Sequence, residues 1–223
     1  MEKQVVKIKS IVKVTHDVVQ IVTEKPSQLK FTPGQATEVF INKEGWLNAG
    51  RPFTFTSLPD DDHVQFTIKT YPERKGVTNE LLSLKKNDEL ILNDIFGAIA
   101  YRGKGVFIAG GAGVTPFISI FRELQSKGET DGNKLIFANK TKADIILRQE
   151  FEKLLGKNFI NILSGEKTDG YAHGFITKDF LQAHINDFSG KFYLCGPPPM
   201  MEAVEKLLAD LRVDERSIIK EIF

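Results

Sequence analysis

The chain of 223 residues is poor in cysteine, in net charge and in long apolar runs. Its single cysteine, Cys195, excludes an internal disulfide and a four-cysteine iron–sulfur site within the chain. The formal net charge of +1 gives no bulk field that would favour nucleic acid or an anionic membrane. No apolar run is long enough to span a bilayer, and the N-terminus lacks the apolar segment of a signal peptide. We therefore expect a soluble, cytoplasmic protein.

Histidine is also scarce, and its positions show no metal-binding pattern. The four histidines are scattered along the chain, so we expect no metal site. Charged residues make up 26% and hydrophobic residues 41%, which is enough apolar material to bury a core. The length fits one large domain or two small ones.

The first part of the chain reads as β-structure. Up to residue 96 it contains short apolar runs of period two, separated by turn signals such as Pro33-Gly34, Glu44-Gly45 and Pro59-Asp60-Asp61. Six short strands of this kind predict a small antiparallel barrel, with one helix at about 78–84. The predicted strands contain Val5–Lys9, Val18–Val22, Glu38–Ile41, Phe53–Thr56, Val64–Ile68 and Glu89–Leu92.

From Gly105 onward, strands alternate with segments of helical length. This rhythm predicts a doubly wound α/β domain with a parallel sheet of five strands. We expect the domain boundary near Gly97–Lys104, which divides the chain into 1–100 and 101–223. The predicted strands are 105–109, 134–138, 159–163, 191–195 and 217–222, and the predicted helices are 116–127, 145–155, 177–184 and 198–210.

A glycine turn follows the first predicted parallel strand. Glycines within Gly110–Gly113 allow a sharp turn and close approach to a phosphate, and Pro116 suits the first helical position. The helix start then faces an anion such as a dinucleotide pyrophosphate, to which Thr115 adds a hydroxyl. A turn without a ligand is the alternative. Pro116 replaces the third glycine of the usual fingerprint, and Asn139-Lys140-Thr141 stands where an acidic residue usually ends the second strand.

A second loop at a strand end is rich in glycine and proline. The fourth predicted strand runs into Cys195-Gly196-Pro197-Pro198. We expect the first and fourth strands to be neighbours where the strand order reverses, and ligands bind outside the carboxyl ends of strands at such a point. Gly111–Thr115 and Cys195–Pro198 would then line one crevice. The alternative for Cys195 is a buried thiol at a strand end.

Six motifs in order resemble the ferredoxin–NADP⁺ reductase superfamily, and more closely its compact bacterial members such as flavodoxin reductases and the reductase modules of flavohaemoglobins. The resemblance covers nearly the whole chain. It implies an FAD-binding barrel followed by an NAD(P)-binding domain. The motifs are Pro33-Gly34-Gln35, Arg51-Pro52-Phe53-Thr54-Phe55-Thr56-Ser57, Gly76-Val77-Thr78-Asn79, Gly111-Ala112-Gly113-Val114-Thr115-Pro116, Cys195-Gly196-Pro197-Pro198 and Glu221-Ile222-Phe223.

The resemblance assigns residues to the cofactors. Arg51 offers a planar cation to the FAD pyrophosphate, Phe53 a stacking surface to the flavin, and Thr78 a cap to the pyrophosphate. Many family members carry tyrosine where this chain has Phe53, so a hydrogen bond from that position is lost. The complete set of expected cofactor-binding residues is Arg51, Pro52, Phe53, Thr54, Ser57, Ile68, Lys69, Gly76, Val77, Thr78, Gly111, Gly113, Val114, Thr115, Pro116, Gly196, Pro197 and Phe223.

Four residues carry catalytic expectations from the same resemblance. Thr54 resembles the hydroxyl residue near flavin N5, and Cys195 would lie near nicotinamide C4. Phe223 resembles the terminal aromatic residue that covers the flavin, and Glu221 could join a proton path. The alternatives are an ordinary strand hydroxyl at Thr54, a tail tied into the core at Phe223 and a solvated end residue at Glu221.

The implied reaction is hydride transfer from NADPH or NADH to FAD, followed by electron transfer to an external acceptor. The expected partner is a small electron-carrier protein such as flavodoxin or ferredoxin. We expect the enzyme itself to be a monomer. A reductase of free flavin, ferric chelates or another small acceptor is the alternative, and an inactive nucleotide-binding accessory subunit is a third interpretation. Family members that select NADPH often have arginine after Ser164, where this chain has Gly165, and this difference argues against NADPH. Lys140 or Lys167 could still bind the 2′-phosphate of NADPH, so the choice between NADH and NADPH stays open.

Overall fold

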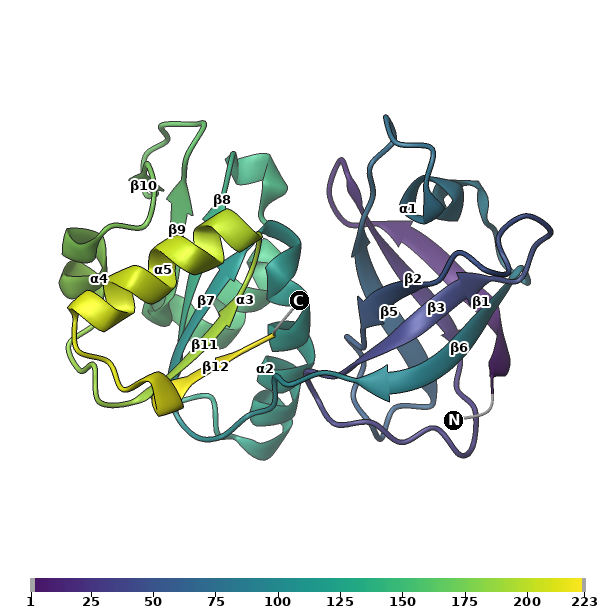
Figure 1. The fold of residues 1–223 in the computed structure, drawn as a ribbon, viewed down its shortest axis with the longest axis horizontal. Helices are drawn as coiled ribbons and strands as arrows, with labels where there is room; N and C mark the ends of the chain where they lie inside the picture. Colours follow the sequence, from purple (N-terminus) through teal and green to yellow (C-terminus); the bar gives the residue numbers. More distant parts are fainter. Residues whose placement is uncertain (1–2, 222–223) are drawn as a thin grey trace. The chain divides into compact units, whose positions relative to one another are not determined.

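The computed structural model describes residues 3–221 (Figure 1). The chain folds into two compact units. One runs up to Ala100 and takes in Thr115–Glu123, and we call it the barrel unit. The other holds Tyr101–Val114 and the described residues from Leu124 onward, and we call it the sheet unit. Among the residues described, no helix is long and apolar enough to cross a membrane.

The barrel unit contains six antiparallel strands, as predicted. Their order in the sheet is β4-β3-β6-β1-β2-β5, and every neighbouring pair is antiparallel. The strands are β1 (Gln4–Lys13), β2 (Val18–Glu24), β3 (Ala36–Ile41), β4 (Arg51–Thr54), β5 (His63–Lys69) and β6 (Glu89–Phe96).

The two edge strands of this sheet meet, which closes the barrel. Phe55, directly after β4, forms an antiparallel bridge with Phe66 of β5, and Thr56 N donates to Gln65 O at 2.8 Å. Period-two alternation places one face of each strand inward, as at Phe66 and Ile68. The closed sheet has no free edge along this stretch, and β4 is thereby held in a fixed position.

The sheet unit contains a parallel sheet of order β10-β9-β8-β7-β11-β12, in which all neighbouring pairs are parallel. The class is as predicted, but the strand count of five was wrong. The sixth strand, β10, has only two residues, and so short a run leaves no periodic signal in the sequence. The strands are β7 (Gly105–Gly110), β8 (Lys134–Asn139), β9 (Phe159–Leu163), β10 (Ala172–His173), β11 (Lys191–Cys195) and β12 (Ile218–Lys220).

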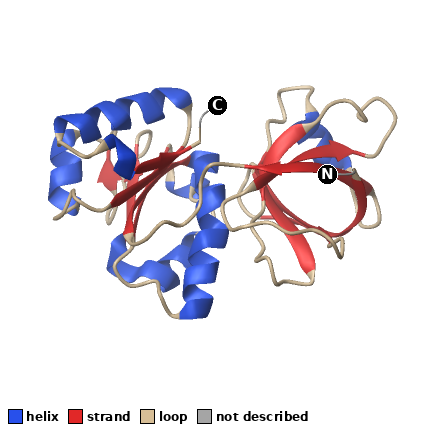
Figure 2. Ribbon diagram, turned by 60° about the horizontal axis from the view of Figure 1, so that its bottom comes forward, coloured by secondary structure: helices blue, strands red, loops and turns tan. Residues whose placement is uncertain are grey.

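Helices cover both faces of the parallel sheet (Figure 2). Leu181 of α4 and Val204 of α5 pack with Ile108 and Ile136 in one core. On the opposite face, Phe151 of α3 packs against Phe159 of β9, with ring centroids 5.5 Å apart. The helices are α2 (Thr115–Lys127), α3 (Arg148–Leu155), α4 (Lys178–His184) and α5 (Pro198–Asp210).

Two predicted helices differ from those observed. The helix predicted at 145–155 begins only at Arg148, because Leu147 has a left-handed backbone (φ +50°) that a continuous helix does not allow. The helix predicted at 78–84 is one α-turn, α1 (Val77–Glu80), followed by a 3₁₀ turn at Leu81–Ser83. The other predicted helices agree with the observed ones within one residue at each end.

Candidate functional site

Strand β4 presents the start of the predicted flavin segment at the barrel surface. Arg51 and Pro52 are exposed, whereas Phe53 and Thr54 are half-buried. The Arg51 guanidinium donates to the Gly50 carbonyl at 2.7 Å, and the Phe53 ring packs against the barrel core. Phe53 lies 6.5 Å from Phe66 between ring centroids. Because the barrel supports one side of this ring, its position is fixed while part of it stays accessible.

Three more of the predicted flavin residues, Ser57, Ile68 and Lys69, make contacts within the barrel unit. Ser57 is buried, and its hydroxyl accepts the Gln65 N–H at 3.0 Å. Ile68 is 2% exposed within the core. Lys69 Nζ lies 2.8 Å from Asp17 Oδ2. The side chains of Ser57 and Ile68 are therefore directed away from solvent, and Lys69 is held by a carboxylate.

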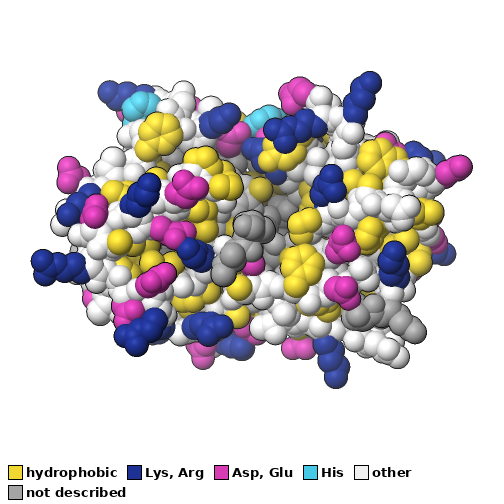
Figure 3. All heavy atoms as spheres, in the orientation of Figure 1, with side chains coloured by type: hydrophobic (Ala, Val, Ile, Leu, Met, Phe, Trp, Pro, Cys, Tyr) yellow, Lys and Arg dark blue, Asp and Glu magenta, His cyan; other side chains and the backbone are white. Residues whose placement is uncertain are grey.

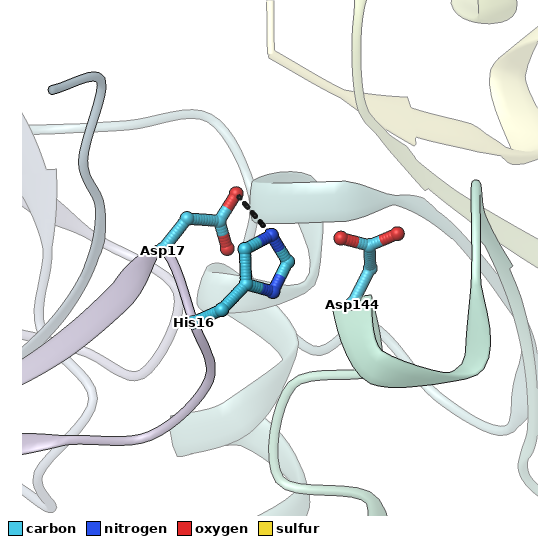
Figure 4. A group of neighbouring side chains, drawn as sticks. All are labelled: His16, Asp17 and Asp144. Carbon is cyan, nitrogen blue, oxygen red and sulfur yellow. Dashed lines mark ion pairs between the residues drawn. The ribbon is translucent and has the colours of Figure 1, made fainter. Parts of the chain in front are cut away.

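Asp17 was not among the sequence candidates, and nothing in the sequence pairs it with a lysine so far along the chain. Burial alone would raise the pKa of Asp17, but hydrogen bonds from Lys69 and Thr15 outweigh it and lower this pKa. The His16 ring also pairs with the Asp17 carboxylate, at 3.7 Å (Figure 4). Asp17 is thus ionised at neutral pH and orients Lys69. Asp144, also drawn in Figure 4, belongs to the sheet unit.

The start of α1 is open to solvent. No side chain caps its N-terminus, where Gly76 has an extended backbone (φ −128°, ψ 179°). A Cβ added at Gly76 would meet nothing within 4 Å. Val77 is buried and anchors the turn, and Thr78 is half-buried. This arrangement leaves room for an anionic group beside Gly76 and Thr78.

The glycine turn after β7 is pressed against the end of β11. A Cβ at Gly113 would lie 2.2 Å from the Cys195 carbonyl oxygen, and one at Gly110 would lie 2.4 Å from the Met200 sulfur. Gly111, in contrast, has a left-handed backbone (φ +51°), and a Cβ there would meet nothing within 4 Å. The turn is therefore closed on the side of β11 and open at Gly111, so its shape fits the approach of a phosphate.

Helix α2 begins directly after this turn, with proline in its first turn and no side-chain cap. Val114 is fully buried, and Thr115 and Pro116 follow it. Within the barrel unit, Thr115 Oγ1 donates to Thr54 Oγ1 at 3.4 Å. Ser119 Oγ accepts the Gly34 N–H at 3.1 Å, and these bonds seat the helix start on the barrel. Two residues predicted for different cofactors, Thr54 and Thr115, are thus brought together.

Strands β7 and β11 are neighbours, as predicted, with Cys195 opposite Ala109. Cys195 is 6% exposed, and burial together with the negative charge of Glu221 raises the pKa of its thiol to about 12. The thiol is therefore neutral at physiological pH. Gly196 and Pro197 continue from it into α5. Phe223 lies outside the residues that the structure describes.

Charges of both signs are interspersed over the face drawn in Figure 3, where lysine and arginine alternate with aspartate and glutamate. The loop at Tyr71–Lys75 carries one cation–aromatic contact, between Arg74 and the Tyr71 ring at 4.9 Å. An interspersed surface of this kind gives weak long-range electrostatic steering of a charged partner.

Comparison with known proteins identifies both units. Residues 3–128 match the family of FAD-binding domains, and residues 107–206 match the oxidoreductase NAD-binding domain. The FAD-binding match extends beyond β6 through α2, whose first nine residues pack in the barrel unit.

Curated relatives include NADH-cytochrome b5 reductase 2 of Mycosarcoma maydis, which is 30% identical over 88% of this chain and 62% of its own length. The ferredoxin–NAD(P)⁺ reductase component of the naphthalene 1,2-dioxygenase system of Pseudomonas putida is 25% identical over 94% of this chain and 65% of its own. The chain thus spans less than two thirds of these relatives.

The fold is that of the flavohaemoglobin-like FAD/NAD-binding domain of nitric oxide dioxygenase from Vibrio cholerae, with a TM-score of 0.88, 22% identity and coverage of 99% of this chain and 98% of that one. The match to the FAD-binding family alone covers more than half of the chain. The chain therefore belongs to the ferredoxin–NADP⁺ reductase-like superfamily, with its FAD-binding domain followed by its NAD(P)-binding domain.

Proposed function

We propose that the chain catalyses hydride transfer from NADH or NADPH to bound FAD and then passes electrons to an external acceptor. The observation that carries this proposal is the pairing of two cofactor-binding domains with a glycine turn that is open at Gly111 and closed against β11. Bound FAD supplies the redox chemistry, since a flavin accepts a hydride and can release electrons one or two at a time.

The barrel unit would hold FAD. Arg51 is exposed and donates to the neighbouring Gly50 carbonyl, so its guanidinium can turn toward a pyrophosphate. The start of α1 at Val77 and Thr78 offers backbone N–H groups to the same anion, beside Gly76. Phe53 would support the flavin ring by stacking, because its ring is held by the core on one side.

The sheet unit would hold the nicotinamide nucleotide by its pyrophosphate at Gly111–Val114. The start of α2, which has no side-chain cap, suits a negative charge. Gly196 and Pro197 border the turn through the contact between Gly113 and the end of β11. The nicotinamide would then lie toward Cys195, whose carbonyl fixes the distance between the two loops.

Thr54 and Cys195 would orient the reacting groups rather than exchange protons. The Thr54 hydroxyl accepts a hydrogen bond from the Thr115 hydroxyl and can direct its own O–H toward the flavin. The Cys195 thiol stays protonated because of its raised pKa of about 12, so it offers a neutral, polarisable contact to nicotinamide. Glu221 and Phe223 keep the proton-path and ring-covering roles that the resemblance implies.

The acceptor is proposed to be a small electron-carrier protein. The relatives bear names that specify cytochrome b5 and ferredoxin. The single cysteine excludes a four-cysteine iron–sulfur centre within this chain, so electrons must leave it. Flavodoxin belongs to the same class of carrier.

Steady-state turnover with carrier proteins and with small-molecule acceptors, measured side by side, tests the proposal. We expect NADH- or NADPH-dependent reduction of ferredoxin, flavodoxin or cytochrome b5 with a kcat/KM well above that for free FMN or a ferric chelate. Arg51→Gln should lower FAD affinity and turnover, whereas Arg216→Gln, which alters an exposed pair with Asp214 in the sheet unit, should leave both unchanged. Faster turnover with free FMN than with every carrier would instead identify a small-acceptor reductase.

A further inference from the structure

Helix α2 presents a row of polar side chains to the barrel, and the proposed function gives a role only to the first of them. The row consists of Thr115, Ser119 and Arg122, whose spacings of four and three residues place them on one face of the helix. All three residues belong to the barrel unit, as does the flavin segment. Their bonds to the barrel are therefore internal to one compact unit.

The first two bonds of this row are made by uncharged groups. Thr115 Oγ1 donates to Thr54 Oγ1 at 3.4 Å, which is longer than a usual bond between hydroxyls. Ser119 Oγ accepts the Gly34 N–H at 3.1 Å. The contact between Thr54 and Thr115 therefore needs a stronger attachment elsewhere on the helix if its position is to be fixed.

Arg122, about two helical turns after Thr115, supplies this attachment. Its Nη1 donates to the Thr56 backbone carbonyl at 2.7 Å and to Gln65 Oε1 at 2.6 Å. Hydrogen bonds from a charged donor are roughly twice as strong as those between neutral groups. The two short bonds of Arg122 are therefore the strongest attachment of the row to the barrel.

The acceptors of Arg122 are themselves held inside the barrel. Thr56 is fully buried, its N–H donates to the Gln65 carbonyl at 2.8 Å, and its hydroxyl lies 3.1 Å from the Thr67 hydroxyl. The Gln65 N–H in turn donates to Ser57 Oγ at 3.0 Å. A buried network whose members bond to one another is rigid, so Arg122 is attached to a fixed point.

The short segment from Thr54 to Thr56 connects this fixed point to the proposed flavin contact. Phe55, between the two threonines, is fully buried in the barrel core. Helix and segment are thus joined at two places, by Thr115 at one end and by Arg122 at the other. Because both the helix and the segment are rigid, Arg122 determines where the start of α2 lies relative to Thr54.

We propose that Arg122 is a positioning residue for hydride transfer, because it fixes the start of α2 relative to the segment that carries Thr54. This inference rests on the proposed function, in which the start of α2 binds the nucleotide pyrophosphate and Thr54 faces the flavin. Arg122 acts through the helix and through Thr56 rather than by contact with either cofactor. Loss of Arg122 should therefore affect the rate of hydride transfer more than the binding of FAD or nucleotide.

Rapid-mixing measurements of flavin reduction in the FAD-loaded protein test this expectation. Arg122→Met removes both bonds and keeps an apolar stem. We expect its limiting rate with NADH or NADPH to fall by about 10- to 100-fold, and its dissociation constants for FAD and NAD⁺ to change by less than about threefold. Arg122→Lys keeps the charge and can make one of the two bonds, so its rate should be intermediate. Gln125→Met, at an exposed position of the same helix, is the matched control and should keep the wild-type rate.

Amide hydrogen exchange gives a readout that does not depend on the reaction. We expect Arg122→Met to speed exchange by about tenfold in the first two turns of α2 and at the Phe55 N–H, which donates to the Gln35 carbonyl. Exchange in β7 and β8 should stay as in the wild type. Unchanged exchange in the first two turns of α2 would show that Arg122 does not hold the helix start, and would refute the proposal.

The kinetic outcomes are equally decisive. A limiting rate in Arg122→Met within about twofold of the wild type refutes the proposal, whatever the change in stability. Weaker binding of FAD or NAD⁺ with a normal rate at saturation refutes it as well. If Arg122→Met is poorly folded, the rates of Arg122→Lys and of Gln65→Met, which removes only the Oε1 acceptor, decide the question. Failure of the proposed function looks different, because neither nucleotide would then reduce the FAD of the wild type.

Discussion

Replacing Gly113 by alanine should separate the glycine turn from the end of β11. The added Cβ would lie 2.2 Å from the Cys195 carbonyl oxygen, 2.5 Å from its carbonyl carbon and 2.7 Å from the Gly196 Cα. All three are backbone atoms, so no side-chain rotation relieves the clash. Gly113 has no left-handed backbone, and the effect is therefore one of space rather than of strain.

The magnitude follows from that distance. Ordinary contact begins at 3.4 Å, so the turn or the strand end must move by about 1.2 Å. Forcing an extra carbon into packed backbone costs about 1–3 kcal/mol of unfolding free energy. A displacement of about 1 Å at a positioning loop reduces the rate about 10²-fold. We expect a lower melting temperature, weaker NAD⁺ binding and a larger loss in kcat.

Calorimetric NAD⁺ binding and thermal unfolding measure these effects separately. Gly128→Ala is the matched control, because Gly128 has φ +69° and a Cβ there would meet nothing within 4 Å. The control should lose about 1–2 kcal/mol of stability from backbone strain and keep its NAD⁺ affinity. If Gly113→Ala also keeps wild-type NAD⁺ affinity and hydride transfer, the turn is not the nucleotide site.

Three further predictions concern other parts of the molecule. Native Cys195 should resist iodoacetamide at pH 8 because its pKa is raised to about 12, and a rate equal to that of the denatured chain would contradict this. Asp17→Asn should remove about 1 kcal/mol of unfolding free energy at pH 7. Because the pKa of Asp17 is lowered in the folded state, this difference from wild type should shrink as the pH falls below 3.8. Chemical denaturation of both proteins at several pH values measures the difference, and a loss that does not change with pH would contradict the reasoning. Arg122→Ala should cost about 1.5–3 kcal/mol, since Arg122 donates to Thr56 O at 2.7 Å and to Gln65 Oε1 at 2.6 Å; a smaller loss in the same assay would mean that these bonds do not seat α2 on the barrel.

The spacing of apolar residues and the positions of turn-forming residues were sufficient to predict the fold class. The alternation in β5 and the apolar run of β7 appear directly in the sequence, and Pro198 at the first position of α5 marks the start of that helix. The two-residue β10 and the left-handed Leu147 could not be predicted, because each depends on tertiary contacts rather than on a repeating pattern.

In the candidate site, too, some features follow from the sequence pattern and others depend on tertiary contacts. Its loops follow from glycine and proline positions, and the motif spacing carried the resemblance. Contacts between distant residues, such as Asp17 with Lys69 and Thr54 with Thr115, leave no trace in a single sequence. The alternation of strand faces also did not reveal that Ser57 bonds to the backbone inside the barrel. The roles of the individual site residues stay predictions.

Anaerobic reduction of the purified protein tests the central claim most directly. After loading with FAD, the yellow protein should lose its flavin absorbance on addition of stoichiometric NADH or NADPH and recover it when an electron acceptor is added. Protein that binds no FAD, or flavin that stays oxidised with both nucleotides, would contradict the account.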